Sequence, residues 1–128
     1  MTPELNLLVW SAVLAFVQML IAASGAQLQV GVPTLAGNRE DLPTIRSWAG
    51  RARRAHLNMI ENLLLFTILV LVAQIAGKTN GMTLLGAQIF FWARVVYAAV
   101  YLAGIPWVRT AVWAVSVIGM LLIFRQLV

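Results

Sequence analysis

The sequence has no cysteine and a single histidine among its 128 residues. Without cysteine the chain forms no disulfide, and no thiol of its own can act as a nucleophile or a metal ligand. A lone histidine, His56, also argues against a transition-metal site, which needs several nitrogen or sulfur ligands. If thiol chemistry takes place here, a cosubstrate must bring the thiol.

Charged residues are also scarce, at 10% of the chain, whereas a soluble domain usually contains about 25%. Four apolar stretches account for the difference, over residues 5–30, 55–76, 82–103 and 107–127. Each approaches the ~20 residues that an α-helix needs to cross a bilayer. None shows the alternating pattern of a strand in a membrane barrel. The sequence therefore predicts an all-α protein, in which residues 1–128 form one integral membrane four-helix bundle.

The net charge of +5 does not indicate nucleic-acid binding, because the position of the basic residues follows membrane topology. Most of them lie on one side of the predicted bundle, at Arg39, Arg46, Arg51, Arg53, Arg54 and Arg109. The opposite side has Lys78 and Arg125. Cytoplasmic loops are enriched in lysine and arginine. We therefore expect the long first loop, residues 31–50, to face the cytoplasm and both termini to lie outside.

The first apolar stretch differs from a cleaved signal peptide. Its leading residues, "MTPELN", include no lysine or arginine, and its apolar run is longer than that of a signal peptide. We expect it to stay in the protein as a membrane span.

The stretch "RARRAHLNMIENLLLF" places polar residues where a lipid-facing helix would have leucines. Arg54, Asn58 and Glu61 are spaced i, i+4 and i+7, so they share one helix face, and Arg51 extends that face outward. In the third span, Arg94, Tyr97 and Tyr101 share a face in the same way, and they are spaced i, i+3 and i+7.

Glu61 and Arg94 are predicted to lie at similar depth. With a rise of 1.5 Å per residue, they lie about 13 Å and about 15 Å from the same membrane face. An isolated charge there costs roughly 2.5–3.5 kcal/mol. We expect the two residues to contact each other or one shared ligand, and the sequence leaves open a purely structural ion pair between spans two and three.

The balance of charge favours a ligand over that ion pair. Four arginines approach the cytoplasmic half, Arg51, Arg54, Arg94 and Arg109, and Glu61 is the only acid near them. Such a pocket suits an anion with more than one carboxylate or phosphate group. Neutral donors and acceptors are supplied by His56, Asn58, Tyr97 and Tyr101.

The pattern "RxxRAHxNxxE", from Arg51 to Glu61, resembles the signature of the MAPEG superfamily, the membrane-associated proteins of eicosanoid and glutathione metabolism. "ARVVYAAVY" and "PWVRT", later in the chain, match the second part of that signature. The superfamily includes microsomal glutathione transferases and the leukotriene and prostaglandin synthases. The likeness covers four spans, their order and nearly the whole length, and the protein looks most like a bacterial member.

The resemblance implies a homotrimer of four-helix subunits in a bacterial inner membrane, with glutathione bound between neighbours and open to the cytosol. The residues that it implies for the glutathione site are Arg51, Arg54, His56, Asn58, Glu61, Arg94, Tyr97 and Tyr101. Arg109 would stand beside the thiol and stabilise its thiolate, helped by Thr110.

Three functions are compatible with these observations. The first is a glutathione-dependent transferase or peroxidase, acting on a lipophilic electrophile that enters from the bilayer. The second is a non-catalytic membrane protein of the same fold that binds lipid or another ligand. The third is a small proton-coupled drug exporter, which needs a carboxylate that exchanges protons. The arginines around Glu61 disfavour the exporter, because they would hold this carboxylate ionised and repel cationic drugs.

Overall fold

The computed structural model describes residues 1–40 and 43–128 of the chain, so the first loop expected over residues 31–50 is described except at Asp41 and Leu42. The described residues form five helices and no strand: α1 (Pro3–Val30), α2 (Val32–Ala36), α3 (Ser47–Ile75), α4 (Gly81–Ala103) and α5 (Pro106–Leu127). All but α2 are long and apolar enough to cross a membrane. The prediction of an all-α integral membrane four-helix fold is therefore confirmed.

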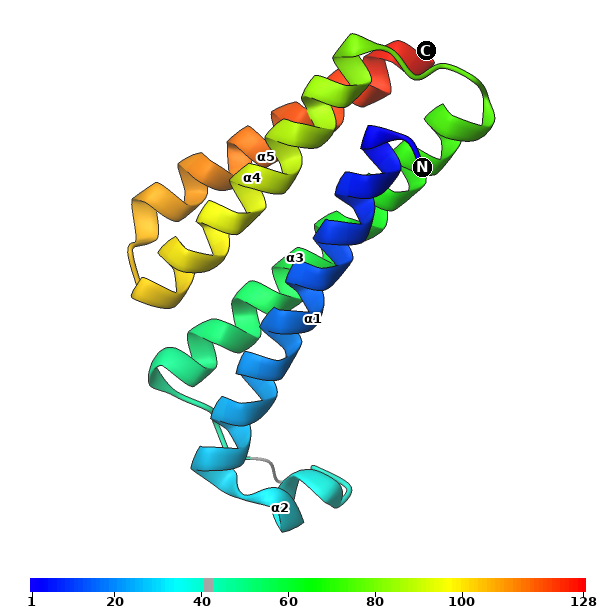
Figure 1. The fold of residues 1–128 in the computed structure, drawn as a ribbon. Coiled ribbons are helices and arrows are strands. Elements are labelled where there is room, and N and C mark those ends of the chain that lie inside the picture. Colours follow the sequence, from blue (N-terminus) through cyan, green and yellow to red (C-terminus); the bar gives the residue numbers. More distant parts are fainter. Residues whose placement is uncertain (41–42) are drawn as a thin grey trace.

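The four long helices run alternately up and down, so the two termini lie at one end of the molecule and α2 lies at the other (Figure 1). α1 packs chiefly on α3, and α4 packs chiefly on α5. Contacts of α3 with α4 and α5, and of α1 with α4, join these two pairs. The cytoplasmic end of our sequence-based topology therefore corresponds to the end that contains α2 and the α4–α5 turn.

Glycines set the closest helix approaches. A Cβ atom on Gly86 of α4 would lie 2.5 Å from the carbonyl oxygen of Gly119 in α5. A Cβ atom on Gly25 of α1 would lie 2.6 Å from the Cβ of Ala49 in α3. Small residues allow such approaches in lipid, where close van der Waals packing supplies much of the association energy. Each helix pair is therefore built on a glycine contact.

The apolar core joins α3 to α4 and α5. Phe66 and Phe90 stack at its centre, with ring centroids 4.0 Å apart, and both side chains are fully buried. Met120 and Ile123 of α5 pack in the same cluster. Because a stacked aromatic pair buries a large area, this core fixes α3 against the α4–α5 pair.

Hydrogen bonds close the end of the bundle that contains the termini. Thr2 donates to Gln74 at 2.7 Å, and Asn80 donates to Gln126 at 2.8 Å. Asn80 also caps the N-terminus of α4, since its side-chain oxygen accepts from the backbone N–H of Thr83 at 3.0 Å. These bonds lie within the α1–α3 and α4–α5 pairs, whereas at the opposite end Arg51 and Arg54 of α3 donate to α4 and so join the two pairs.

The helix α3 begins at Ser47, before the apolar stretch that starts at Ala55. The arginines Arg51, Arg53 and Arg54 therefore lie on a helix rather than in a loop. Hydropathy detects where lipid contact starts and not where helical hydrogen bonding starts. Long arginine side chains are compatible with a helix that continues past the hydrocarbon, because their charged ends reach water.

Candidate functional site

Arg94, on α4, is the largest fully buried side chain, at 1% exposure. None of its three guanidinium nitrogens has a hydrogen-bond partner among the described residues. Its Cζ lies 4.2 Å from the centroid of the Tyr97 ring, one turn along the same helix. A cation–π contact offsets part of the cost of burying a cation but satisfies none of its N–H donors. Arg94 is therefore a buried cation that still requires acceptors.

Two tyrosines connect Arg94 to the neighbouring helices. The rings of Tyr97 and Tyr101 meet edge to face, with centroids 5.5 Å apart. Cζ of Arg109, on α5, lies 4.5 Å from the Tyr101 ring centroid. Nε of Arg54, on α3, donates to the Tyr101 hydroxyl at 3.3 Å. We call these five residues the arginine–tyrosine cluster; it draws its members from three helices.

A polar cavity of about 180 Å³ adjoins this cluster. It is lined by Asn58 of α3, Tyr97 of α4, and Arg109, Thr110 and Trp113 of α5. The hydroxyl of Thr110 donates to the carbonyl of Pro106 over a long 3.4 Å, so it can exchange that bond for another acceptor. The cavity thus offers a guanidinium, a hydroxyl and an amide around one space.

Asn58 is held in place by Asn62, its neighbour one turn along α3. The Asn62 side-chain nitrogen donates to the Asn58 carbonyl at 2.9 Å and to its side-chain oxygen at 3.2 Å. Asn62 is buried, so this contact is protected from water. It orients the Asn58 amide and leaves its NH₂ donors for a ligand.

Arg51 lies at the edge of the site and has a structural partner. Its Nε donates to the carbonyl of Leu102 at 3.0 Å, near the end of α4. A cation close to a helix C-terminus is favourable, because the last carbonyls lack intrahelical partners. Arg51 therefore ties α3 to α4 at the end that includes α2.

His56 lies apart from the arginine–tyrosine cluster. It lines another cavity, of about 230 Å³, together with Met19 of α1 and with Arg39 and Arg53. Its Nδ1 is buried and has no hydrogen-bond partner among the described residues. Within one chain, His56 therefore does not meet the residues with which the sequence grouped it.

Glu61 is exposed on the surface of the single chain. It makes no hydrogen bond to Arg94, whose guanidinium nitrogens all lack partners among the described residues. The structure thus provides no direct link between these two residues, and a shared ligand stays a prediction. Asn58 and Glu61, spaced i and i+3, still lie on neighbouring positions of one α3 face.

Trp113 is a site residue that the sequence did not single out. Its spacing from Arg109, i to i+4, places both on one face of α5, and that spacing was the available signal. It lines the polar cavity together with Arg109 and Thr110. The cavity wall therefore combines a guanidinium with two aromatic side chains, Tyr97 and Trp113.

The charged side chains of the site are all cationic. Arg54, Arg94 and Arg109 surround two tyrosines, and none of these arginines forms an ion pair within the described part of the chain. Guanidinium groups bind carboxylates through paired hydrogen bonds, which strengthen where water is excluded.

The MAPEG family model matches residues 7–128, which is nearly the whole chain. No curated protein and no solved structure matches the chain. The matched range includes α3, α4 and α5 in full, and with them every residue of the cluster and its cavity. The resemblance that the arginine-rich motif indicated is confirmed, and the chain belongs to the MAPEG family.

Proposed function

We propose that this protein is a glutathione-dependent membrane transferase or peroxidase that acts on lipophilic electrophiles. The observation that supports this best is the buried guanidinium of Arg94, which has no hydrogen-bond partner among the described residues. The guanidinium packs on the ring of Tyr97, which lines a cavity together with Arg109. A buried cation is expensive, and an anionic ligand would supply its missing acceptors.

Glutathione fits the chemistry of these residues. It has two carboxylates, one amino group, peptide carbonyls and a thiol. Arginines match the carboxylates, and the amide of Asn58 matches a peptide carbonyl. Glu61, on the same α3 face as Asn58, is a carboxylate for the ligand's amino group.

Arg109 is the residue that we assign to the thiol. A cation near a thiol lowers the pKa of the thiol, because it favours the charged thiolate. The thiolate is the nucleophile in attack on an electrophile or a peroxide. Thr110 adds a hydroxyl that can donate to the sulfur once its long bond to Pro106 is exchanged.

A single chain contains only part of this site. Its cavity of about 180 Å³ is smaller than the roughly 300–1,000 Å³ of most small-molecule pockets. Glu61 is exposed on α3, within the apolar stretch of a helix that is long enough to span a membrane. Both features support glutathione bound between subunits, and the family resemblance implies that the oligomer is a homotrimer.

We also propose an orientation in the membrane and a route for the hydrophobic substrate. The arginine-rich end would face the cytoplasm of a bacterial cell, where glutathione is available, and both termini would lie outside the inner membrane. The hydrophobic substrate would enter from membrane lipid and would contact Trp113, which lines the cavity.

A non-catalytic protein that binds lipid or another ligand is the second candidate. An apolar cavity of about 370 Å³ favours it, lined by Leu65 and Ile68 of α3 and by Val117, Leu121 and Phe124 of α5. Such a protein would bind lipophilic molecules without activating a thiol.

The two candidates separate in one experiment on detergent-purified protein. Ultraviolet absorbance at the thiolate band follows glutathione binding, while turnover is measured with an aromatic electrophile and with a lipid hydroperoxide. A transferase or peroxidase forms thiolate and turns over at least one of the two. Binding without thiolate or turnover would support the non-catalytic candidate.

A further inference from the structure

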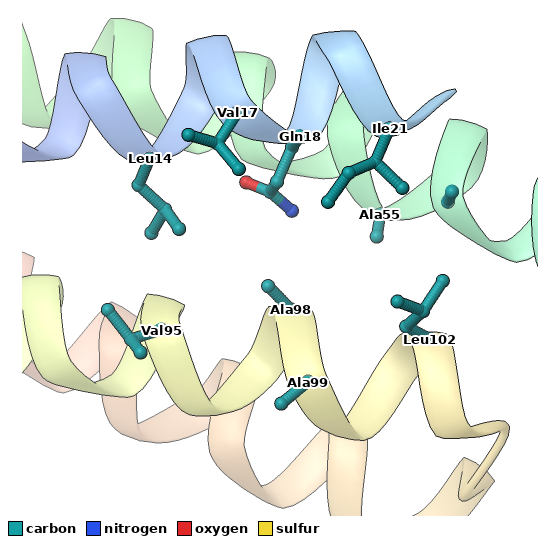
Figure 2. Close-up of a pocket in the computed structure, with 10 residues that line it drawn as sticks. Leu14, Val17, Gln18, Ile21, Ala55, Val95, Ala98, Ala99 and Leu102 are labelled. Atoms are coloured by element: carbon teal, nitrogen blue, oxygen red, sulfur yellow. The ribbon is translucent and has the colours of Figure 1, made fainter. Parts of the chain in front are cut away.

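A separate apolar cavity lies between α1, α3 and α4 (Figure 2). Its volume is about 250 Å³. On α4 it is lined by Val95, Ala98, Ala99 and Leu102, which are spaced i, i+3, i+4 and i+7 and so form one helix face. None of these residues lines the polar cavity near Arg109. α4 therefore separates two cavities of different chemistry.

Gln18 of α1 is the only residue with a polar side chain among those that line this cavity. It is 6% exposed, and its Oε1 has no hydrogen-bond partner among the described residues. Figure 2 shows its carboxamide directed into the space between α1 and α4. A buried amide oxygen without a partner costs about 1–3 kcal/mol. Gln18 thus marks the point in the cavity where a bound molecule would need one polar group.

Alanines keep the cavity open. Ala52 and Ala55 of α3 face it from one side, and Ala98 and Ala99 of α4 face it from another. Small residues usually let membrane helices close on each other, as Gly86 and Gly119 do between α4 and α5. Here the helices leave a space that larger side chains would fill.

We propose that this cavity binds a lipophilic molecule with a single hydroxyl group, which hydrogen-bonds to Gln18. A hydroxyl both donates and accepts, so it satisfies the amide in either orientation. No charged residue lines the cavity, so a carboxylate or phosphate would be buried without a counter-ion. The volume suits one short aliphatic chain or a small ring system and is below that of most drug-sized pockets.

This site is independent of the proposed glutathione site. It shares no lining residue with the polar cavity, and its recognition depends on apolar contact and one neutral hydrogen bond. Occupation is therefore expected with or without glutathione.

The test uses the full chain in phosphatidylcholine nanodiscs and a dodecanol derivative with a diazirine in mid-chain. After irradiation, mass spectrometry should locate the label on lining residues of α1, α3 and α4. Unlabelled 1-dodecanol should compete at a concentration at least tenfold lower than its methyl ether, which cannot donate a hydrogen bond. Equal competition by the two compounds would overturn the proposal.

Two variants and one control sharpen the test. Gln18→Leu should remove the advantage of the alcohol over the ether and keep apolar labelling. Ala98→Leu should fill the cavity and reduce labelling by both compounds. Gln27→Leu, an exposed glutamine on the same helix, should change neither. If a variant is poorly produced, the ratio of alcohol to ether in the unmodified chain decides by itself.

Three further results would contradict the proposal. Gln18→Leu could retain the preference for alcohol, or the label could spread evenly over lipid-facing residues, which indicates bulk lipid contact only. The third result would be that Ala98→Cys cross-links readily to the same position in a second copy. This result would indicate that a neighbouring subunit occupies the cavity.

Discussion

Arg109 of α5 lies over the ring of Tyr101, with 4.5 Å between its Cζ and the ring centroid, and Arg54 of α3 donates to the hydroxyl of the same tyrosine at 3.3 Å. One α4 side chain thus orients cations from two other helices. A guanidinium above a ring gains roughly 0.5–2 kcal/mol and keeps its N–H donors at the edge, where an anion can reach them. Tyr101 therefore orients both arginines and does not neutralise their positive charges.

Replacing Arg109 should impair thiolate formation. One charge-assisted contact contributes about 1.5–3 kcal/mol, so Arg109→Ala should lower thiolate stabilisation by a factor on the order of ten or more. Arg109→Lys keeps the positive charge that orients the helix but loses the forked geometry. Its thiolate stabilisation should therefore lie between that of the unmodified protein and that of Arg109→Ala. Ultraviolet absorbance of bound glutathione across a pH titration measures the effect. If Arg109→Ala forms thiolate as the unmodified protein does, Arg109 is only a topology residue.

Replacing Arg94 distinguishes a ligand-binding residue from a structural one. Arg94 has no hydrogen-bond partner among the described residues. Arg94→Met should therefore leave the melting temperature of the glutathione-free protein unchanged or raise it. The same variant should lose glutathione affinity by at least about tenfold, because the acceptors of the ligand lose a buried cation. Thermal unfolding in detergent, with and without glutathione, measures both. A large drop in the melting temperature of the free protein would indicate that Arg94 has a structural partner instead.

Glu61 should matter through the ligand or the oligomer. Its side chain is exposed in one subunit and does not hydrogen-bond to Arg94. Glu61→Gln removes the charge at nearly constant shape, and we expect it to destabilise the oligomer or to abolish glutathione binding. Normal melting together with normal glutathione affinity in this variant would exclude both roles.

The fold was largely predictable from the sequence, because the length of an apolar stretch is set by the thickness of the bilayer. The start of α3 at Ser47 and the short helix α2 were not predictable in this way. Arg51, Arg53 and Arg54 interrupt the apolar pattern, yet they continue the helix beyond the lipid. Hydropathy therefore reports the length of chain that crosses the membrane and underestimates the length of the helix.

The site was predictable only in part. Helical spacing correctly placed Arg94 and Tyr97 on one face, and the structure brings them into contact. Matched depth suggested contact between Glu61 and Arg94, but depth does not fix the rotation of each helix about its axis. Arg94 turns to Tyr97 on its own helix, and Glu61 lies on an exposed face.

Packing between α4 and α5 should depend on Gly86. In Gly86→Ala, the added Cβ would lie 2.5 Å from the Gly119 carbonyl oxygen, so the helices must move apart. We expect a loss of about 1–3 kcal/mol, the usual range for overpacking. Gly81→Ala is the matched control, since a Cβ there meets nothing within 4 Å. Thermal unfolding compares the two, and equal stability would show that this contact does not limit the fold.

The protein should be a homo-oligomer, and we expect a trimer. Glu61 is exposed in the single chain and lies within the apolar stretch of α3, so covering it with a neighbour would remove a charged group from lipid. Native mass measurement in mild detergent, with the detergent subtracted, gives the number of subunits. A monomer that still binds glutathione with full affinity would count against a site between subunits.

The most direct test of the proposed function is calorimetric titration of the detergent-purified oligomer with glutathione, beside Arg94→Met at the same concentration. We expect saturable binding to the unmodified protein and at least tenfold weaker binding to the variant. No saturable binding to an intact oligomer, or equal affinity in the two proteins, would contradict the assignment of the arginine–tyrosine cluster as a glutathione site.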